Sequence, residues 1–131
     1  MLFNKSYGEL KEEPMTIDTF ARKDPITIHP LNEEIVKAIT DLNGVIVVAH
    51  DGLGFRYRIL FTDTNYGASV IKAKGSYGHE KDLFELAVLY NGHLCYDTEV
   101  TNDVISNLTD GDVLTIIRVI KRLDENGRIR R

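Results

Sequence analysis

The chain has 131 residues, enough for one domain that buries a core without disulfides or structural metals. Twenty acidic and sixteen basic residues give a formal net charge of −4, which argues against a dedicated binder of duplex DNA, since such proteins are usually net basic. The single cysteine, Cys95, excludes an internal disulfide framework, and no apolar run reaches the length of a membrane span. We therefore expect a soluble cytoplasmic protein that has no membrane partner.

The first 25 residues form a polar segment that carries two of the three prolines and shows no regular apolar period. Such a composition is typical of a terminal arm that lies outside the folded core. The sequence thus predicts two parts, an amino-terminal arm over residues 1–25 and a single domain over residues 26–131.

The next segment has the pattern of an amphipathic helix. Apolar residues recur at helical spacing over residues 31–42, and Glu33 and Glu34 lie where negative charge favours the start of a helix. Pro30 suits the first turn, and Gly44 is expected to take the left-handed conformation that ends the helix.

From residue 45 onward the apolar period changes to two, which indicates strands. About five strands are expected, over residues 45–50, 55–62, 68–74, 83–90 and 93–98. Asn91 and Gly92 predict a two-residue hairpin turn in which both residues have positive φ. The short connections favour an antiparallel meander.

The second and third strands supply the candidate binding residues. A symmetric turn between them would place Arg58 opposite Lys72 and Arg56 opposite Lys74, so that all four basic side chains share one face. Like charges held opposite each other destabilise a free sheet, and an acidic partner would relieve that repulsion. We therefore take Arg56, Arg58, Lys72 and Lys74 as candidate binding residues, together with Tyr96 on the same face.

The other face is expected to form the core, with Tyr57, Ile71 and Leu86 buried together. The basic face also carries apolar residues, among them Val45 and Val47, which are more than a purely solvated surface needs. Two explanations stay open. The basic residues belong either to an ordinary solvent-exposed sheet face or to a binding surface.

The carboxyl-terminal part predicts a second helix over residues 109–123, opened by a capping box of Thr109 and Asp112. A short helical turn is expected to begin at Thr101, and Gly127 follows the long helix. Two helices can cover the core face of the sheet. The predicted fold class is therefore α+β, an antiparallel meander of about five strands packed on one face by two helices.

No catalytic or metal-binding motif is recognisable. The histidines lack the spacing of helical metal ligands, and Cys95 has no second cysteine with which to bind a metal. The glycine-rich loops serve turns more readily than phosphates, because a phosphate loop is expected to open a helix. We expect no enzymatic activity and no cofactor, and an enzyme of unrecognised type stays an alternative.

Residues 82–113 contain a strand that reads F-E-x-A-V-L, then a turn, C-Y-D-T, and T-x-D-V. This pattern resembles small accessory proteins encoded by phages and prophages. The resemblance covers about a quarter of the chain, and no functional residue can be transferred from it. It implies a binding protein in a bacterial host cell that modulates or inhibits a host macromolecule, of the anti-CRISPR or anti-defence type.

The expected partner is a host protein or a nucleoprotein complex, given the net negative charge. The alternative is a nucleic-acid-binding accessory protein that uses the basic sheet face. Because the mixed face is hard to leave bare, we also expect a homodimer, or else a covering by the amino-terminal arm.

Overall fold

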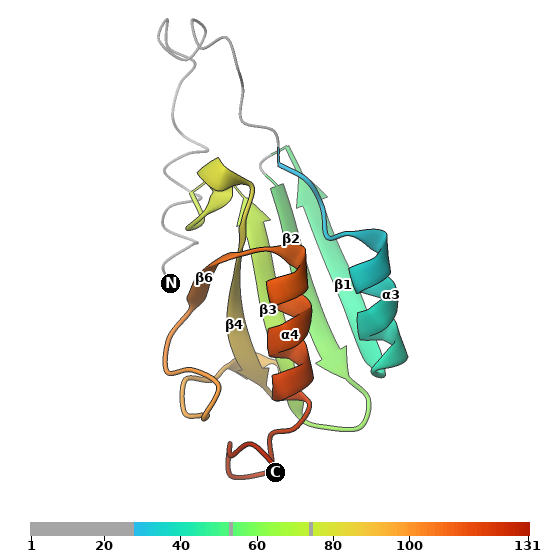
Figure 1. Ribbon diagram of the computed structural model, residues 1–131, viewed down its shortest axis with the longest axis vertical. Helices are drawn as coiled ribbons and strands as arrows, with labels where there is room; N and C mark the ends of the chain where they lie inside the picture. Colours follow the sequence, from blue (N-terminus) through green and yellow to red (C-terminus); the bar gives the residue numbers. More distant parts are fainter. Residues whose placement is uncertain (1–27, 53, 74) are drawn as a thin grey trace, which may run out of the picture.

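The structure is a computed structural model that describes residues 28–52, 54–73 and 75–131. The predicted arm over residues 1–25 and the candidate residue Lys74 lie outside the described residues. The described helices pack on one sheet (Figure 1). The elements are α3 (Glu33–Asp41), β1 (Gly44–Asp51), β2 (Gly54–Phe61), β3 (Tyr66–Ala73), the 3-10 helix η1 (His79–Lys81), β4 (Phe84–Tyr90), β5 (His93–Leu94), β6 (Ile105–Leu108) and α4 (Asp110–Ile120).

The sheet is antiparallel throughout, with the order β1-β2-β3-β4-β5, and β6 also pairs with β4. Because β3 occupies one side of β4, β5 and β6 must share the other side. The predicted α+β meander is confirmed, but its last part is corrected. The fifth strand ends at Leu94, the expected helical turn at Thr101 is a bend, and Ile105–Leu108 forms a strand that was not predicted.

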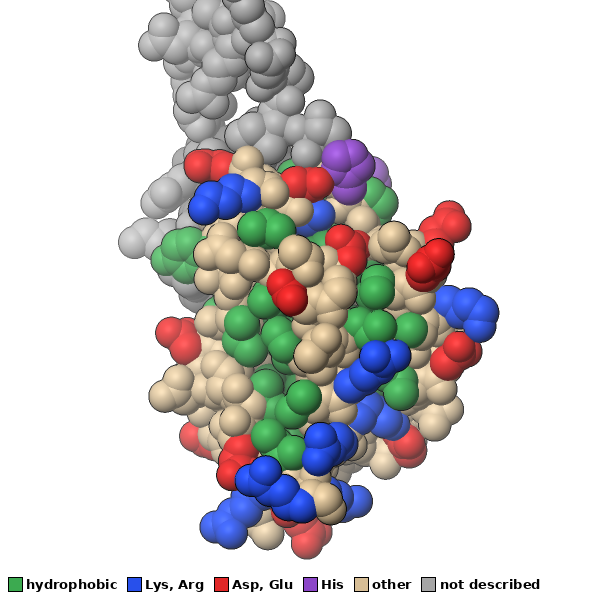
Figure 2. Space-filling view, in the orientation of Figure 1, with side chains coloured by type: hydrophobic (Ala, Val, Ile, Leu, Met, Phe, Trp, Pro, Cys, Tyr) green, Lys and Arg blue, Asp and Glu red, His purple; other side chains and the backbone are tan. Residues whose placement is uncertain are grey.

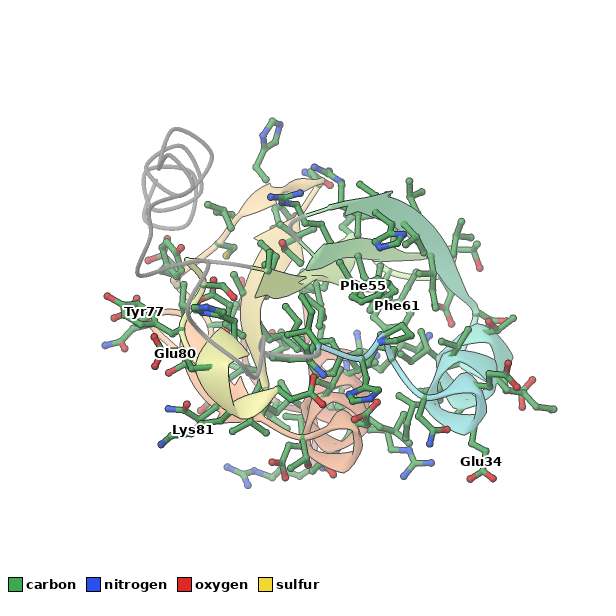
Figure 3. All side chains as sticks on the ribbon, turned by 90° about the horizontal axis from the view of Figure 1, so that it is seen from above. Glu34, Phe55, Phe61, Tyr77, Glu80 and Lys81 are labelled. Atoms are coloured by element: carbon green, nitrogen blue, oxygen red, sulfur yellow. The ribbon has the colours of Figure 1, made fainter. Side chains whose placement is uncertain are left out.

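Both described helices lie on the same face of the sheet, as Figures 1 and 3 show. The core fills the space between these two layers, and its fully buried members come from α3, α4 and the three central strands. They include Ile39, Ile59, Ala68, Val70, Phe84, Leu86, Val88, Val113, Ile117 and Ile120. We refer to the face of the sheet turned away from the helices as the outer face.

Side-chain caps begin both helices. At α4 the predicted capping box is confirmed, since the Asp112 N–H donates to the Thr109 hydroxyl (3.2 Å) and the Thr109 N–H donates to the Asp112 carboxylate (3.0 Å). At α3 the cap is Asn32, whose side chain accepts from the Glu34 N–H at 2.7 Å. Pro30 therefore precedes the cap, so its predicted place in the first turn is wrong.

The end of α3 differs from the prediction in one residue. Asn43 takes the left-handed conformation, with φ of 66°, and Gly44 is already part of β1. Gly44 is nevertheless needed, because a Cβ atom there would lie 2.7 Å from Cγ2 of Ile39. The hairpin turn between β4 and β5 follows the prediction, with φ of 51° at Asn91 and 80° at Gly92.

The register between β2 and β3 corrects the predicted basic face. β3 begins at Tyr66, earlier than expected, and pairs Arg58 with Ser69 and Phe55 with Lys72. The predicted pairing of Arg58 with Lys72 is therefore wrong. The difference is an odd number of residues, so the side chains of β3 swap faces. Lys72 points to the helices, and Ile71 lies on the outer face.

The register of β3 depends on close approach at one glycine. Gly67 pairs with Leu60, and a Cβ atom at Gly67 would lie 2.2 Å from the carbonyl oxygen of Ile59. A residue with a side chain fits at position 67 only if β2 and β3 move apart. At Gly52, in the connection after β1, an added Cβ atom would have no other atom within 4 Å.

We expect Gly67→Ala to lower the free energy of unfolding by about 2–3 kcal/mol, because the added methyl group overpacks a paired backbone. Gly52→Ala serves as the control and should change stability by less than about 0.5 kcal/mol. Chemical denaturation monitored by circular dichroism measures both values. Equal stability of the two variants would contradict the register of β2 and β3.

Candidate functional site

The structure separates the basic residues that the sequence grouped together. Arg56 and Arg58 lie on the outer face of β2, as predicted, whereas Lys72 lies on the helix side of β3. Tyr96 follows β5 and is partly exposed. The candidate residues are therefore divided between the surroundings of Lys72 and the outer face.

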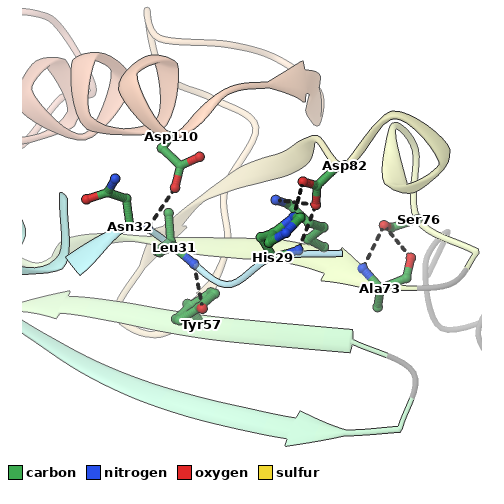
Figure 4. A network of polar contacts seen from close by, with 9 residues as sticks. His29, Leu31, Asn32, Tyr57, Ala73, Ser76, Asp82 and Asp110 are labelled. Carbon is green, nitrogen blue, oxygen red and sulfur yellow. Dashed lines mark hydrogen bonds and ion pairs between the residues drawn. The ribbon is translucent and has the colours of Figure 1, made fainter. Parts of the chain in front are cut away.

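Lys72 is buried at one end of the sheet and belongs to the same polar cluster as Asp82 and His29, which Figure 4 labels. Its side chain is only 2% exposed, and Nζ lies 3.0 Å from Oδ1 of Asp82. The same ammonium group stands 3.9 Å from the ring centroid of Phe84. Because a charge inside a protein must be paired, Asp82 supplies the opposite charge, and the aromatic ring adds a cation–π contact.

Asp82 also holds the segment that leads into α3. The His29 N–H donates to Oδ1 at 2.7 Å, and Nδ1 of His29 lies 2.6 Å from Oδ2. Partial burial acts to raise the pKa of Asp82, but the hydrogen bonds from His29 and Lys72 outweigh it and lower that pKa. Among the described residues, no serine or threonine hydroxyl and no cysteine thiol forms a hydrogen bond with His29. The His29–Asp82 pair therefore has no nucleophile bonded to it.

Two further contacts tie the same segment to the rest of the domain. The Leu31 N–H donates to the Tyr57 hydroxyl at 2.9 Å, and the Asn32 N–H donates to the Asp110 carboxylate at 2.7 Å. Burial raises the pKa of Tyr57, so its hydroxyl stays neutral and accepts this bond. The cluster in Figure 4 therefore fastens residues 28–32 to β2, η1 and α4, which is a structural role.

The outer face carries exposed apolar groups beside a basic one. Val45 is 51% exposed and Val47 is 57% exposed, and they pair with Leu60 and Arg58 of β2, respectively. Nη2 of Arg58 donates to the Gly92 carbonyl at 2.8 Å, which holds the guanidinium group over the turn between β4 and β5. We term Val45, Val47, Arg58 and Leu60 the open face.

Figure 2 shows the opposite, helix-bearing side, on which the charges separate. Acidic side chains gather around the beginnings of α3 and α4, and basic ones gather around the end of α4. This arrangement complements the helix dipoles, and it explains these charges without a ligand.

Glu85 occupies an unusual place on the outer face. It pairs with Ile71, is only 2% exposed, and neither carboxylate oxygen makes a hydrogen bond. Burial raises the pKa of this carboxyl to about 7. The nearby backbone N–H of Tyr77 lowers the pKa by a smaller amount, and its geometry is too poor for a hydrogen bond.

An open hollow of about 410 Å³ lies beside the turn between β2 and β3, at the end of the domain away from Lys72. Asp63, Tyr66, Tyr90, Asp124 and Arg130 are among its lining residues. Asp63 is paired with Lys121, and Asp124 accepts backbone N–H bonds of its own turn, so both carboxylates are already engaged. The hollow therefore offers few groups for a ligand.

Within residues 28–52, 54–73 and 75–131, no cluster of three or more histidine, cysteine, aspartate or glutamate side chains could hold a metal ion. No helix in this part of the chain is long and apolar enough to cross a membrane.

Comparison with known proteins gives no relative for this chain. No family model, no curated protein and no solved structure matches it. The resemblance of residues 82–113 to phage and prophage proteins therefore stays a prediction.

We expect Asp82→Asn to lower the free energy of unfolding by about 3 kcal/mol, because it leaves the buried Lys72 ammonium without a counter-charge. Lys72→Met removes the buried charge itself and should cost less than about 1.5 kcal/mol. Lys37→Ala, which breaks an exposed ion pair with Asp41, is the control and should cost about 0.5 kcal/mol or less. A smaller loss for Asp82→Asn than for Lys72→Met, measured by urea denaturation, would contradict this account.

Glu85 should make stability depend on pH. Its pKa is raised from 4.5 to about 7, so between these values the folded state binds a proton that the unfolded state has released. The stabilisation is complete below about pH 4.5 and is lost as pH rises through 7, a change of about 3 kcal/mol at most. Glu85→Gln should abolish this dependence, whereas Glu80→Gln on η1 should keep it. Unfolding curves between pH 4.5 and pH 8.5 test this, and identical profiles for wild type and Glu85→Gln would refute it.

Proposed function

We propose that this chain is a non-enzymatic binding protein that contacts a protein partner through the open face of β1 and β2. The observation that carries the proposal is the exposure of Val45 and Val47 beside Arg58, on the side of the sheet that α3 and α4 leave uncovered. The buried centres of protein interfaces are more apolar than the rest of the surface and are enriched in arginine, and the exposed valines beside Arg58 have this composition.

The chemistry of the open face favours a protein over a nucleic acid. Its four members form two cross-strand pairs, Val45 with Leu60 and Val47 with Arg58, so three of the four side chains are aliphatic. Nucleic-acid backbones are bound mainly by rows of cations. Lys72 is taken up by Asp82 inside the domain, so the nucleic-acid alternative loses one of the cations on which it relied.

The partner class follows from the predicted resemblance of residues 82–113 to phage and prophage proteins. On that basis we propose a host protein or nucleoprotein complex, which the chain inhibits by covering a functional surface. A partner with a carboxylate flanked by apolar groups fits the open face, because the carboxylate can pair with Arg58 while the valines lose contact with water.

We expect the variant Val47→Ser/Arg58→Ser to weaken partner binding by about tenfold or more, because it removes one apolar and one charged contact from the centre of the open face. The partner is captured from a bacterial host lysate by the wild-type chain, purified, and titrated by isothermal calorimetry. Lys37→Ser on the exposed side of α3 is the matched control and should bind as the wild type does. Unchanged affinity of the double variant would place the interface elsewhere.

A fluorescent single-stranded and a duplex oligonucleotide provide the opposing test. Binding at about 0.15 M salt, with an affinity that falls steeply as salt rises and a salt slope that Arg58→Ser reduces, would favour the nucleic-acid alternative instead.

A further inference from the structure

The β1 strand forms one edge of the sheet, and no strand of the described residues pairs with its other side. At its beginning the Thr62 N–H donates to the Asn43 carbonyl at 3.0 Å, which marks a hydrogen-bonded pair. Such pairs alternate along antiparallel strands, so the odd-numbered residues of β1 bond to β2. The backbone N–H and C=O groups of Ile46, Val48 and His50 therefore point to the free edge.

The two edges of this sheet differ in how they are protected. The edge next to β4 is divided between β5, with two residues, and β6, with four, and the register between β4 and β6 is irregular. The β1 edge has eight residues in uninterrupted register with β2, and residues 44–50 contain no proline and no acidic, lysine or arginine side chain. Short strands, bulges, charges and prolines are the usual protection of a sheet edge, and β1 lacks them over this stretch.

The side chains along β1 are apolar on both faces of the sheet. Val45 and Val47 belong to the open face, and Val48, which points to the helix side, is still 53% exposed. Helix α3 therefore leaves the middle of this edge uncovered. A strand that paired here would bury valines on both faces and satisfy the outward backbone groups at once.

We propose that β1 pairs antiparallel with β1 of a second copy of this chain, which joins the two sheets across a two-fold axis near Val47 and Val48. Antiparallel pairing with itself brings residues 44–50 against the same stretch, so apolar residues meet apolar residues and no like charges are opposed. Because this stretch of β1 has no charged side chains, it has no charges with which to select a strand of another protein. A second copy of β1 matches it in length and in apolar pattern.

This dimer goes beyond the proposed function. It uses the backbone edge of β1 and leaves the side chains of Arg58 and Leu60 on the surface of both copies. The joined sheet would present two open faces on the same side, next to each other. Val47 belongs to both surfaces, whereas the Arg58 side chain belongs to the open face and the outward backbone of Val48 to the edge. Arg58→Ser and Val48→Pro therefore separate partner binding from dimerisation, and each has its own measurement.

Sedimentation velocity over a range of concentrations tests the dimer, and we expect a dimer for the wild type. Val48→Pro removes an N–H that makes no bond to β2, so it should keep the monomer fold and weaken dimerisation by about tenfold or more. Val47→Pro removes an N–H that β2 uses, and it should lower thermal stability instead. Val48→Thr keeps the backbone donor and should dimerise as the wild type does.

Val48→Lys decides the matter if Val48→Pro does not fold. It keeps the backbone intact and brings two like charges together near the axis, so it should also weaken the dimer by about tenfold or more. In a Cys95→Ser background, Val47→Cys or Val48→Cys should form a disulfide-linked dimer on oxidation, and the more reactive position gives the register. A wild-type monomer at about 1 mM, or a dimer unchanged by Val48→Pro and Val48→Lys, would overturn the proposal.

Discussion

The position of the Lys72 ammonium group inside the domain is the constraint on which much of this structure depends. A buried charge needs a partner, and Asp82 supplies it from the loop that follows η1. Asp82 takes a left-handed conformation there, with φ of 59°. The same carboxylate binds the backbone and ring of His29, so one ion pair connects β3, the η1 loop and the chain that enters α3.

The register of β3 links this interior contact to the surface. With Lys72 turned to the helices, the outer face of β3 presents Ser69, Ile71 and Ala73 instead of a row of cations. Among the described strands, the lysine and arginine side chains of the outer face therefore come from β2. Near the β1 edge the accessible groups are mainly aliphatic, and this is why recognition through apolar contact and backbone pairing fits the molecule better than recognition of a polyanion.

Patterns that act over short distances could be predicted from the sequence, and those that join distant segments could not. The capping box at Thr109 and the turn at Asn91 depend on neighbouring residues, and both were predicted correctly. The register of β3 could not be chosen by alternation, because Val70 and Ile71 make both faces apolar. In the candidate site, Arg58 was predicted on the correct face. Lys72 was not, because a lysine in a strand normally indicates a solvent-exposed position. Its burial depends on Asp82, which belongs to another element. Strand β6 was not predicted, because it is short and contains Asn107, which has a positive φ of 60°.

Two features of the outer face remain energetically costly in the isolated domain, and they differ in kind. Glu85 is a polar group without a hydrogen bond, and the domain tolerates it by favouring the neutral acid, so its cost falls at low pH. The exposed valines of β1 cannot be relieved by protonation, because their cost is contact with water. Only another surface can remove that cost. The edge of β1 also carries backbone groups that do not pair with β2, and a paired strand can form hydrogen bonds with them, which a side-chain contact cannot do as completely. A second copy of the same uncharged strand does this without introducing a new charge.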